Sequence, residues 1–269
     1  MKLWYQSLTR PDAWPAYQAA LKRVLARATD PGTTIEVHGI EQRGGVGDQY
    51  RRLEFIETME VLDNVARAEA EGFDAVLLGN IADPGLRTAR EMVRMPVLGL
   101  CEASLFTACQ MGVAVGLVVS NDKHYSRVLE NVAMYGLNTR VVAVERMAVD
   151  RLVDLDAAFG EGPTRDRILG QFHAAAEACV AKGAEVVVPA VGVAMVLLAE
   201  AGVHETVKET PVLCGPMALV QAGQAAVKLA RAMGGRYASR RGAYAMPPAA
   251  QIEELRRYYG PVYPSVKAP

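Results

Sequence analysis

The chain has 269 residues, which is enough for one large domain or for two domains of about 100–150 residues. Hydrophobic residues make up 51% of it and charged residues 22%, a composition typical of a globular α/β protein. The formal charge of −1 gives no reason to expect nucleic acid or a membrane surface as a partner, and no apolar run approaches the roughly 20 residues of a membrane helix. We therefore expect a cytoplasmic protein that binds a small molecule.

Predicted strands and helices alternate along the whole chain. Short apolar runs predict strands at 2–8, 33–37, 73–78, 95–100, 113–119, 140–144, 184–190 and 211–213. Helices are predicted between them, at 15–28, 48–71, just past 83–85, and at 103–111, 123–135, 164–182, 194–201 and 216–233. This alternation is typical of parallel sheets built from strand–helix–strand units.

The segment LLGNIADPGL, residues 77–86, joins a buried strand to a helix. Asp83 is expected to cap that helix, with Pro84 at its first position. In a parallel sheet, the segment leaving the carboxyl end of a strand faces the ligand crevice, so Asn80 is the first candidate pocket residue. Asp48 is expected to cap the earlier helix at 48–71 in the same way.

The chain also reads as two related halves. FDAVLLGNIADPGL and AEVVVPAVGVAMVLLAEAG each give a strand, a turn and a helix, and each is followed by a Pro-Val-Leu strand. The repeat predicts an α/β fold of two pseudo-symmetric parallel-sheet domains that face one cleft. We place the first domain at 1–100 plus 215–269, and the second at 101–214.

Polar side chains follow several of the predicted strands, where the crevice should lie. They are His38, Cys101, Glu102, Ser120, Asn121 and Cys214. Glu102 is expected to act as general acid or base, with the Cys101 thiol as the alternative, because burial or a helix start can shift either pKa. Ser120 and Asn121 are expected to bind the substrate, since strand-end hydroxyl and amide groups can hold a carboxylate.

The remaining cysteines and histidines are assigned structural roles. Cys109 and Cys179 fall inside predicted helices, where packing is the better interpretation. No cysteine belongs to a CxxC pair or another zinc spacing, so we expect reduced thiols. The other histidines lie on or beside helices away from strand ends and are interpreted as surface or structural residues: His124, His173 and His204.

Four segments together resemble the aspartate/glutamate racemase superfamily, within it the hydantoin racemase-like branch. They are DPGL at 83–86, PVLGLCEAS at 96–104, the strand ending in Ser120-Asn121, and GAEVVVPAVG at 183–192. The resemblance implies two pseudo-symmetric α/β domains with the active site between them. It also implies proton transfer, without an organic cofactor, at a carbon next to a carbonyl or carboxyl group.

The sequence departs from this family at the two residues that do the chemistry. Family racemases use one cysteine in each domain, on opposite faces of the substrate carbon, to remove and to deliver the proton. By alignment these positions fall on Asn80 and on Val191, or on Gly192 if the alignment shifts by one residue. An amide does not take a proton from carbon near neutral pH, and valine has no polar side-chain atom. We therefore do not expect the two-cysteine mechanism.

Three functions fit these residues, and the sequence leaves all three open. The first is an isomerase acting on a hydantoin-like or carboxylated substrate, with Cys101, Glu102 or Cys214 replacing the thiols. The second is a hydrolase or lyase of a cyclic imide or thioimide, including a zinc-dependent variant with ligands from His38, Cys101, Glu102 and Cys214. The third is a non-catalytic small-molecule binding protein. In each case we expect a homo-oligomer.

Overall fold

The computed structural model describes residues 1–46, 50–149 and 151–263. Its first sheet has four parallel strands in the order β2-β1-β3-β4: β1 (Lys2–Gln6), β2 (Thr34–His38), β3 (Ala75–Leu78) and β4 (Val97–Gly99). β3 and β4 are buried along their whole length, as the unbroken apolar runs predict for parallel strands covered on both faces.

The second half of the chain forms a sheet of the same kind. Its parallel strands lie in the order β6-β5-β7: β5 (Val115–Val119), β6 (Val141–Arg146) and β7 (Val186–Pro189). A short antiparallel pair follows, β8 (Glu205–Thr206) and β9 (Thr210–Pro211). Two parallel sheets, one from each half, confirm the predicted α/β fold class.

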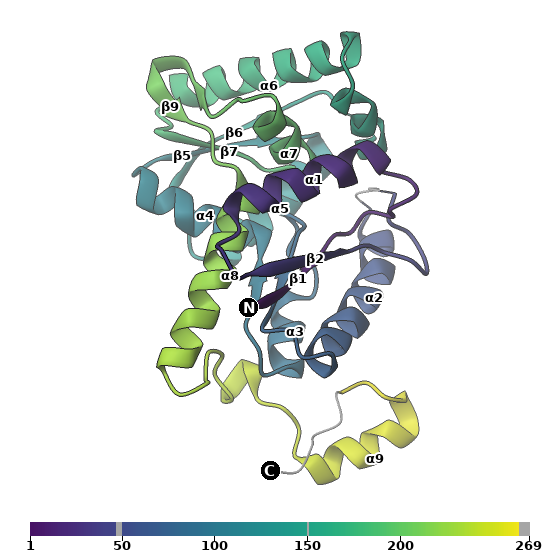
Figure 1. The fold of residues 1–269 in the computed structure, drawn as a ribbon. Coiled ribbons are helices and arrows are strands. Elements are labelled where there is room, and N and C mark those ends of the chain that lie inside the picture. Colours follow the sequence, from purple (N-terminus) through teal and green to yellow (C-terminus); the bar gives the residue numbers. More distant parts are fainter. Residues whose placement is uncertain (47–49, 150, 264–269) are drawn as a thin grey trace.

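Helices cover the two sheets: α1 (Pro15–Ala28), α2 (Arg51–Ala70), α3 (Leu86–Met92), α4 (Leu100–Met111), α5 (Asp122–Met134), α6 (Pro163–Ala181), α7 (Gly192–Glu200) and α8 (Gly215–Ala232). α1 packs against α7 and α8 and lies between the two sheets (Figure 1). The last helix, α9 (Ala249–Tyr259), lies at the opposite end of the molecule from α6 (Figure 1). Within the described residues, every helix is too short or too polar to span a bilayer.

The order of the predicted elements is confirmed, but some of them differ in detail. The predicted strand at 211–213 is reduced to β9 and a single bridge between Val187 and Val212. α9 was not predicted from the sequence, nor were three 3-10 helices, η1 (Leu152–Phe159), η2 (Val207–Glu209) and η3 (Gly242–Tyr244). The predicted cap Asp48 lies outside the described residues, and the domain boundaries at 100/101 and 214/215 stay predictions.

Asp83 accounts for two further differences. It does not cap the helix that follows it in the chain: α3 begins only at Leu86, and its N-cap is Gly85, with a positive φ of 68°. The Asp83 carboxylate instead accepts the backbone N–H groups of Cys101 and Glu102, each at 2.9 Å. These N–H groups belong to the first turn of α4 and have no acceptor within the helix. Because Asp83 supplies that acceptor, α4 begins at Leu100 rather than at the predicted residue 103.

The approach of Asp83 depends on a glycine in β4. A side-chain carbon at Gly99 would lie 2.5 Å from the Asp83 carboxyl carbon, closer than any real contact, so only glycine leaves room for the carboxylate. Tyr135 donates a third hydrogen bond to Asp83, at 2.6 Å. The carboxylate thus joins the segment after β3, the start of α4 and the end of α5.

We predict that Asp83→Ala lowers the free energy of unfolding by about 2 kcal/mol or more, because two helix N–H groups and the Tyr135 hydroxyl lose their acceptor. Tyr135→Phe is the matched control. It removes only one of the three hydrogen bonds and should cost about 1 kcal/mol. Urea denaturation of the three proteins measures both values, and an Asp83→Ala protein within 0.5 kcal/mol of wild type would contradict this capping role.

Candidate active site

A cavity of about 80 Å³ lies where the carboxyl ends of four strands meet. Its lining includes residues that follow β1, β3 and β7, the first turns of α5, and side chains of α1 and α2. The two halves approach closely here, since a methyl group at Gly192 would lie 3.7 Å from the carbonyl oxygen of Gly79. Parallel sheets bind ligands beyond the carboxyl ends of their strands, so this cavity is the candidate active site.

One wall of the cavity carries a chain of hydroxyl groups. Ser7 Oγ and Thr9 Oγ1 lie 2.7 Å apart, and Gln18 donates to Thr9 Oγ1 at 2.7 Å. The Tyr17 hydroxyl joins this chain at Ser7. Burial raises the pKa of Tyr17, and the hydrogen bond from Ser7 offsets this only in part, so the phenol keeps its proton at neutral pH. This wall can donate to and accept from a polar substrate without carrying charge.

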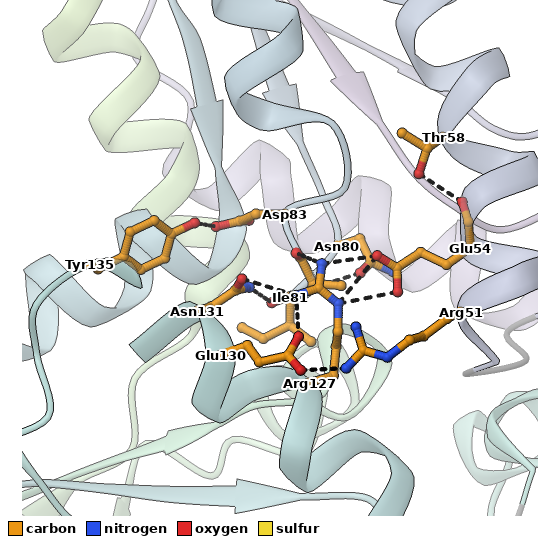
Figure 2. A network of polar contacts seen from close by, with 11 residues as sticks. Arg51, Glu54, Thr58, Asn80, Ile81, Asp83, Arg127, Glu130, Asn131 and Tyr135 are labelled. Carbon is orange, nitrogen blue, oxygen red and sulfur yellow. Dashed lines mark hydrogen bonds and ion pairs between the residues drawn. The ribbon is translucent and has the colours of Figure 1, made fainter. Parts of the chain in front are cut away.

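A stripe on α5 fixes the segment 80–83 of the opposite half (Figure 2). Its residues lie four apart in sequence and so share one helix face. Their side chains contact successive residues of the segment: Arg127 donates to the Ala82 carbonyl at 2.9 Å, Asn131 to the Ile81 carbonyl at 3.2 Å, and Tyr135 to Asp83. The position of Asn80 in the cavity is therefore set by a helix of the other half.

The cavity has little capacity to bind an anion. Arg127 is the one cation among the described residues that line it, and Glu54 of α2 holds the guanidinium at 2.9 Å. The same guanidinium also donates to Asn131, at 3.2 Å, and lies 3.7 Å from Glu130 (Figure 2). A second lining carboxylate belongs to Glu57, which accepts the backbone N–H of Gly45 at 2.6 Å.

His124 lines the cavity and is only 5% exposed. Its Nδ1 lies 3.1 Å from the Ser120 hydroxyl, and its backbone N–H donates to Asn121, the N-cap of α5. Burial lowers the pKa of His124 to about 4, and the positive charge of Arg127 adds to this shift. The imidazole is therefore neutral at physiological pH. From the sequence, His124 was interpreted as a surface or structural residue, although its place three residues after a strand-end N-cap marks it as facing the crevice.

Three of the predicted site residues line the cavity, and they include both positions where the family resemblance implies cysteines. Asn80 and Val191 lie in its lining, as does Gly192. The Asn80 side-chain oxygen Oδ1 accepts the backbone N–H of Ala82 at 2.8 Å, which leaves the side-chain NH₂ group to donate to a ligand. Val191 is 1% exposed and gives the cavity an apolar patch.

Cys101 and Glu102 lie away from the cavity. Because α4 begins earlier than predicted, both residues belong to the first turn of this helix. Glu102 forms a bidentate ion pair with Arg90 in a separate depression on the surface. Cys101 is 1% exposed, and burial raises the pKa of its thiol, with the charge of Asp83 adding to the effect. Neither residue is among those described as lining the cavity.

The other strand-end residues are held by structural contacts. Ser120 supports His124, and the Asn121 side chain caps α5 and donates to the Val149 carbonyl at 2.8 Å. Cys214 is the N-cap of α8, where burial raises its pKa. His38 stacks on Trp4 with ring centroids 3.3 Å apart. None of these four belongs to the cavity lining within the described residues.

The proposed zinc ligands do not converge. His38, Cys101, Glu102 and Cys214 lie at separate places, and the described residues contain no cluster of three or more His, Cys, Asp or Glu side chains that could hold a metal ion. The chemistry that this cavity offers comes from carboxylates, hydroxyls, an amide and a neutral imidazole.

Comparison with known proteins gives the same family on several grounds. A model of the Asp/Glu/hydantoin racemase family matches residues 11–228. Hydantoin racemase of Rhizobium meliloti is 27% identical over 190 residues, which cover 70% of this chain and 72% of that protein. Hydantoin racemase of Pseudomonas sp. (strain NS671) is 29% identical over 91 residues, 34% of this chain, and the match spans only 36% of that protein.

A solved structure shows the same fold. Allantoin racemase from Klebsiella pneumoniae superposes with a TM-score of 0.74, over 92% of this chain and 94% of that protein. The sequences are 20% identical, so this likeness concerns the fold alone.

Proposed function

The chain belongs to the Asp/Glu/hydantoin racemase family, and from this premise we propose that it moves a proton at a carbon next to a carbonyl group. The substrate we propose is a small, neutral, hydantoin-like ring. The cavity at the four strand ends carries this proposal, because polar groups that can hold such a ring and a carboxylate that can act on it line the same space.

The charge of the cavity favours a neutral substrate. Among the described lining residues, Glu54 and Glu57 are acidic, and Arg127 is already held by Glu54. A substrate carboxylate would lose its water shell without gaining a cation, which is costly. A hydantoin ring carries carbonyl acceptors and N–H donors but no carboxylate. It matches the hydroxyl chain of Ser7 and Thr9 and the amide of Asn80.

Glu57 is the group we propose to take the proton. The Glu54 carboxylate is engaged by Arg127. Burial keeps the pKa of His124 near 4 and raises that of Tyr17, so the imidazole is a weak base and the phenol keeps its proton. Hydroxyl and amide side chains do not act as bases at neutral pH. Glu57 is the other acidic residue among the described lining residues, and we propose that its carboxylate, which also accepts the Gly45 N–H, is the base.

The proposed step needs no organic cofactor. The Glu57 carboxylate takes the proton from the ring carbon, and the electron pair of the broken C–H bond moves into the neighbouring carbonyl to give an enolate. The Asn80 NH₂ group donates a hydrogen bond to this ring. Return of the proton to carbon restores both the carbonyl and the Glu57 carboxylate. The substrate carbonyl is thus the electron acceptor, and the protein supplies a base and hydrogen-bond donors.

The first test is exchange of the ring C–H proton in D₂O, followed by proton NMR with and without the protein. We expect protein-dependent exchange for 5-methylhydantoin or allantoin at about 1 s⁻¹ or faster. Aspartate and glutamate should not exchange, because both carry carboxylates that the cavity disfavours. Exchange of the amino acids alone, or of none of the four compounds, would refute the proposed function.

The second test compares two glutamates of α2. Glu57 and Glu60 are both buried, and both accept backbone N–H groups of the loop at 41–45, but of the two only Glu57 lines the cavity. Glu57→Gln keeps the acceptor for Gly45 and removes the base, so we expect exchange to slow by ~10²-fold or more. Glu60→Gln, the matched control, should stay within about threefold of wild type, since non-reacting positions contribute little to the barrier. Equal rates for the two variants would remove Glu57 from the proposed mechanism.

A further inference from the structure

We propose that His124 is a second catalytic residue of this reaction, one that donates a hydrogen bond from Nε2–H to the substrate carbonyl oxygen on which the negative charge develops. The inference rests on the proposed function and deepens it. It assigns the oxyanion-stabilising role to a histidine of the second half, while the proposed base, Glu57, comes from the first.

The geometry of the His124 imidazole supports this role. His124 is 5% exposed and lines the cavity, and its Nδ1 lies 3.1 Å from the Ser120 hydroxyl. Within the described part of the chain, Nε2 has no hydrogen-bond partner, so it is the ring nitrogen that a ligand can reach. When Ser120 donates to Nδ1, the single proton of the neutral ring sits on Nε2, which is the tautomer that donates to a ligand.

His124 is also rigidly placed relative to the rest of the cavity. Its backbone N–H donates to Asn121 at the start of α5, which fixes the first turn of this helix. The same helix carries the Arg127–Asn131–Tyr135 stripe that holds the segment 80–83. The imidazole and the Asn80 amide are therefore fixed by one helix. Donors fixed in advance at the place where charge develops are the most effective, because they need no reorganisation during the reaction.

The charges around the His124 imidazole favour a role as hydrogen-bond donor over a role as base. The groups that face it are Arg127 on its own helix, Glu54 and Glu57 across the cavity, and the neutral Ser120 and Tyr17 hydroxyls. Burial, with Arg127 adding to it, keeps the pKa of His124 near 4. An imidazole of this kind binds a proton weakly, but its N–H donates well to an enolate oxygen. A neutral histidine with a lowered pKa polarises a carbonyl in the same way in triosephosphate isomerase.

Two variants of His124 test the donor role. His124→Gln keeps an N–H donor at about the position of Nε2, whereas His124→Leu keeps the volume and removes the donor. We expect kcat for hydantoin C–H exchange to fall ~10²–10³-fold in His124→Leu and about tenfold in His124→Gln. His173→Gln on α6, outside the cavity, is the matched control and should equal wild type. Circular dichroism checks that each variant is folded.

A readout that does not depend on turnover separates this inference from the proposed function. 5,5-Dimethylhydantoin has no removable ring C–H, so it binds without reacting. In protein labelled with ¹⁵N at histidine, we expect it to shift the His124 Nε2 resonance while the ring stays neutral between pH 5 and 8. Ser120→Ala should change the tautomer signal of the free protein, and Ser120→Thr should restore it.

Each outcome decides one claim. Full activity of His124→Leu, or no shift of Nε2 with 5,5-dimethylhydantoin, overturns the donor role and leaves the family chemistry standing. An equal loss of exchange rate in the Gln and Leu variants, together with a wild-type rate that decreases as the pH is lowered below 6.5, would make His124 the base. This result would also overturn the donor role. A wild-type protein inactive on all hydantoins refutes the proposed function, and the resonance shift still decides whether Nε2 contacts the ring.

Discussion

The contact between one face of α5 and the segment 80–83 is the interaction on which the rest of the site depends. Three side chains four residues apart, two on α5 and one on its C-cap residue Tyr135, hold two backbone carbonyls and one carboxylate of the other half. Asp83, which receives the last of these bonds, caps α4 in turn. Asn80, His124 and the start of α4 are therefore parts of one rigid unit across the two halves. A site that must place a base and donors on one small ring needs this rigidity.

The same contact determines the electrostatics of the cavity. Arg127 is partly buried between Glu54 and the Ala82 carbonyl, where it fixes the segment. Burial lowers the pKa of the neighbouring His124 imidazole, and the charge of Arg127 adds to this effect. A cation used in this way does not serve as an anion receptor. The family scaffold is retained here, but the positions where the resemblance implies thiols fall on Asn80 and on Val191 or Gly192, and the proposed acting groups, Glu57 and His124, come from α2 and α5. The proposed preference for an uncharged ring follows from this arrangement.

Sequence patterns predicted the alternating elements and both parallel sheets, because short apolar runs bounded by turn residues are typical of buried parallel strands. Asn80 and Val191, chosen for their place at strand ends, lie in the lining of the cavity, and their roles there stay predictions. Glu102 was placed in the crevice because it was predicted to follow the strand at 95–100, before a helix beginning at 103. The contact that lets α4 begin at Leu100 comes from Asp83, a residue 17 positions earlier in the chain. Glu57 could not be found from local patterns alone, since only tertiary packing brings its helix face to the cavity. For His124 a local signal existed, its place three residues after the strand-end N-cap Asn121.

The most direct test of this account is a crystal structure of the protein with bound 5,5-dimethylhydantoin. The account predicts that the ring occupies the cavity at the four strand ends, with one carbonyl at hydrogen-bond distance from His124 Nε2 and the substituted carbon facing the Glu57 carboxylate. A ring bound in the depression beside Arg90 and Glu102, or one that lies in the cavity without contacting Glu57 or His124, would contradict it.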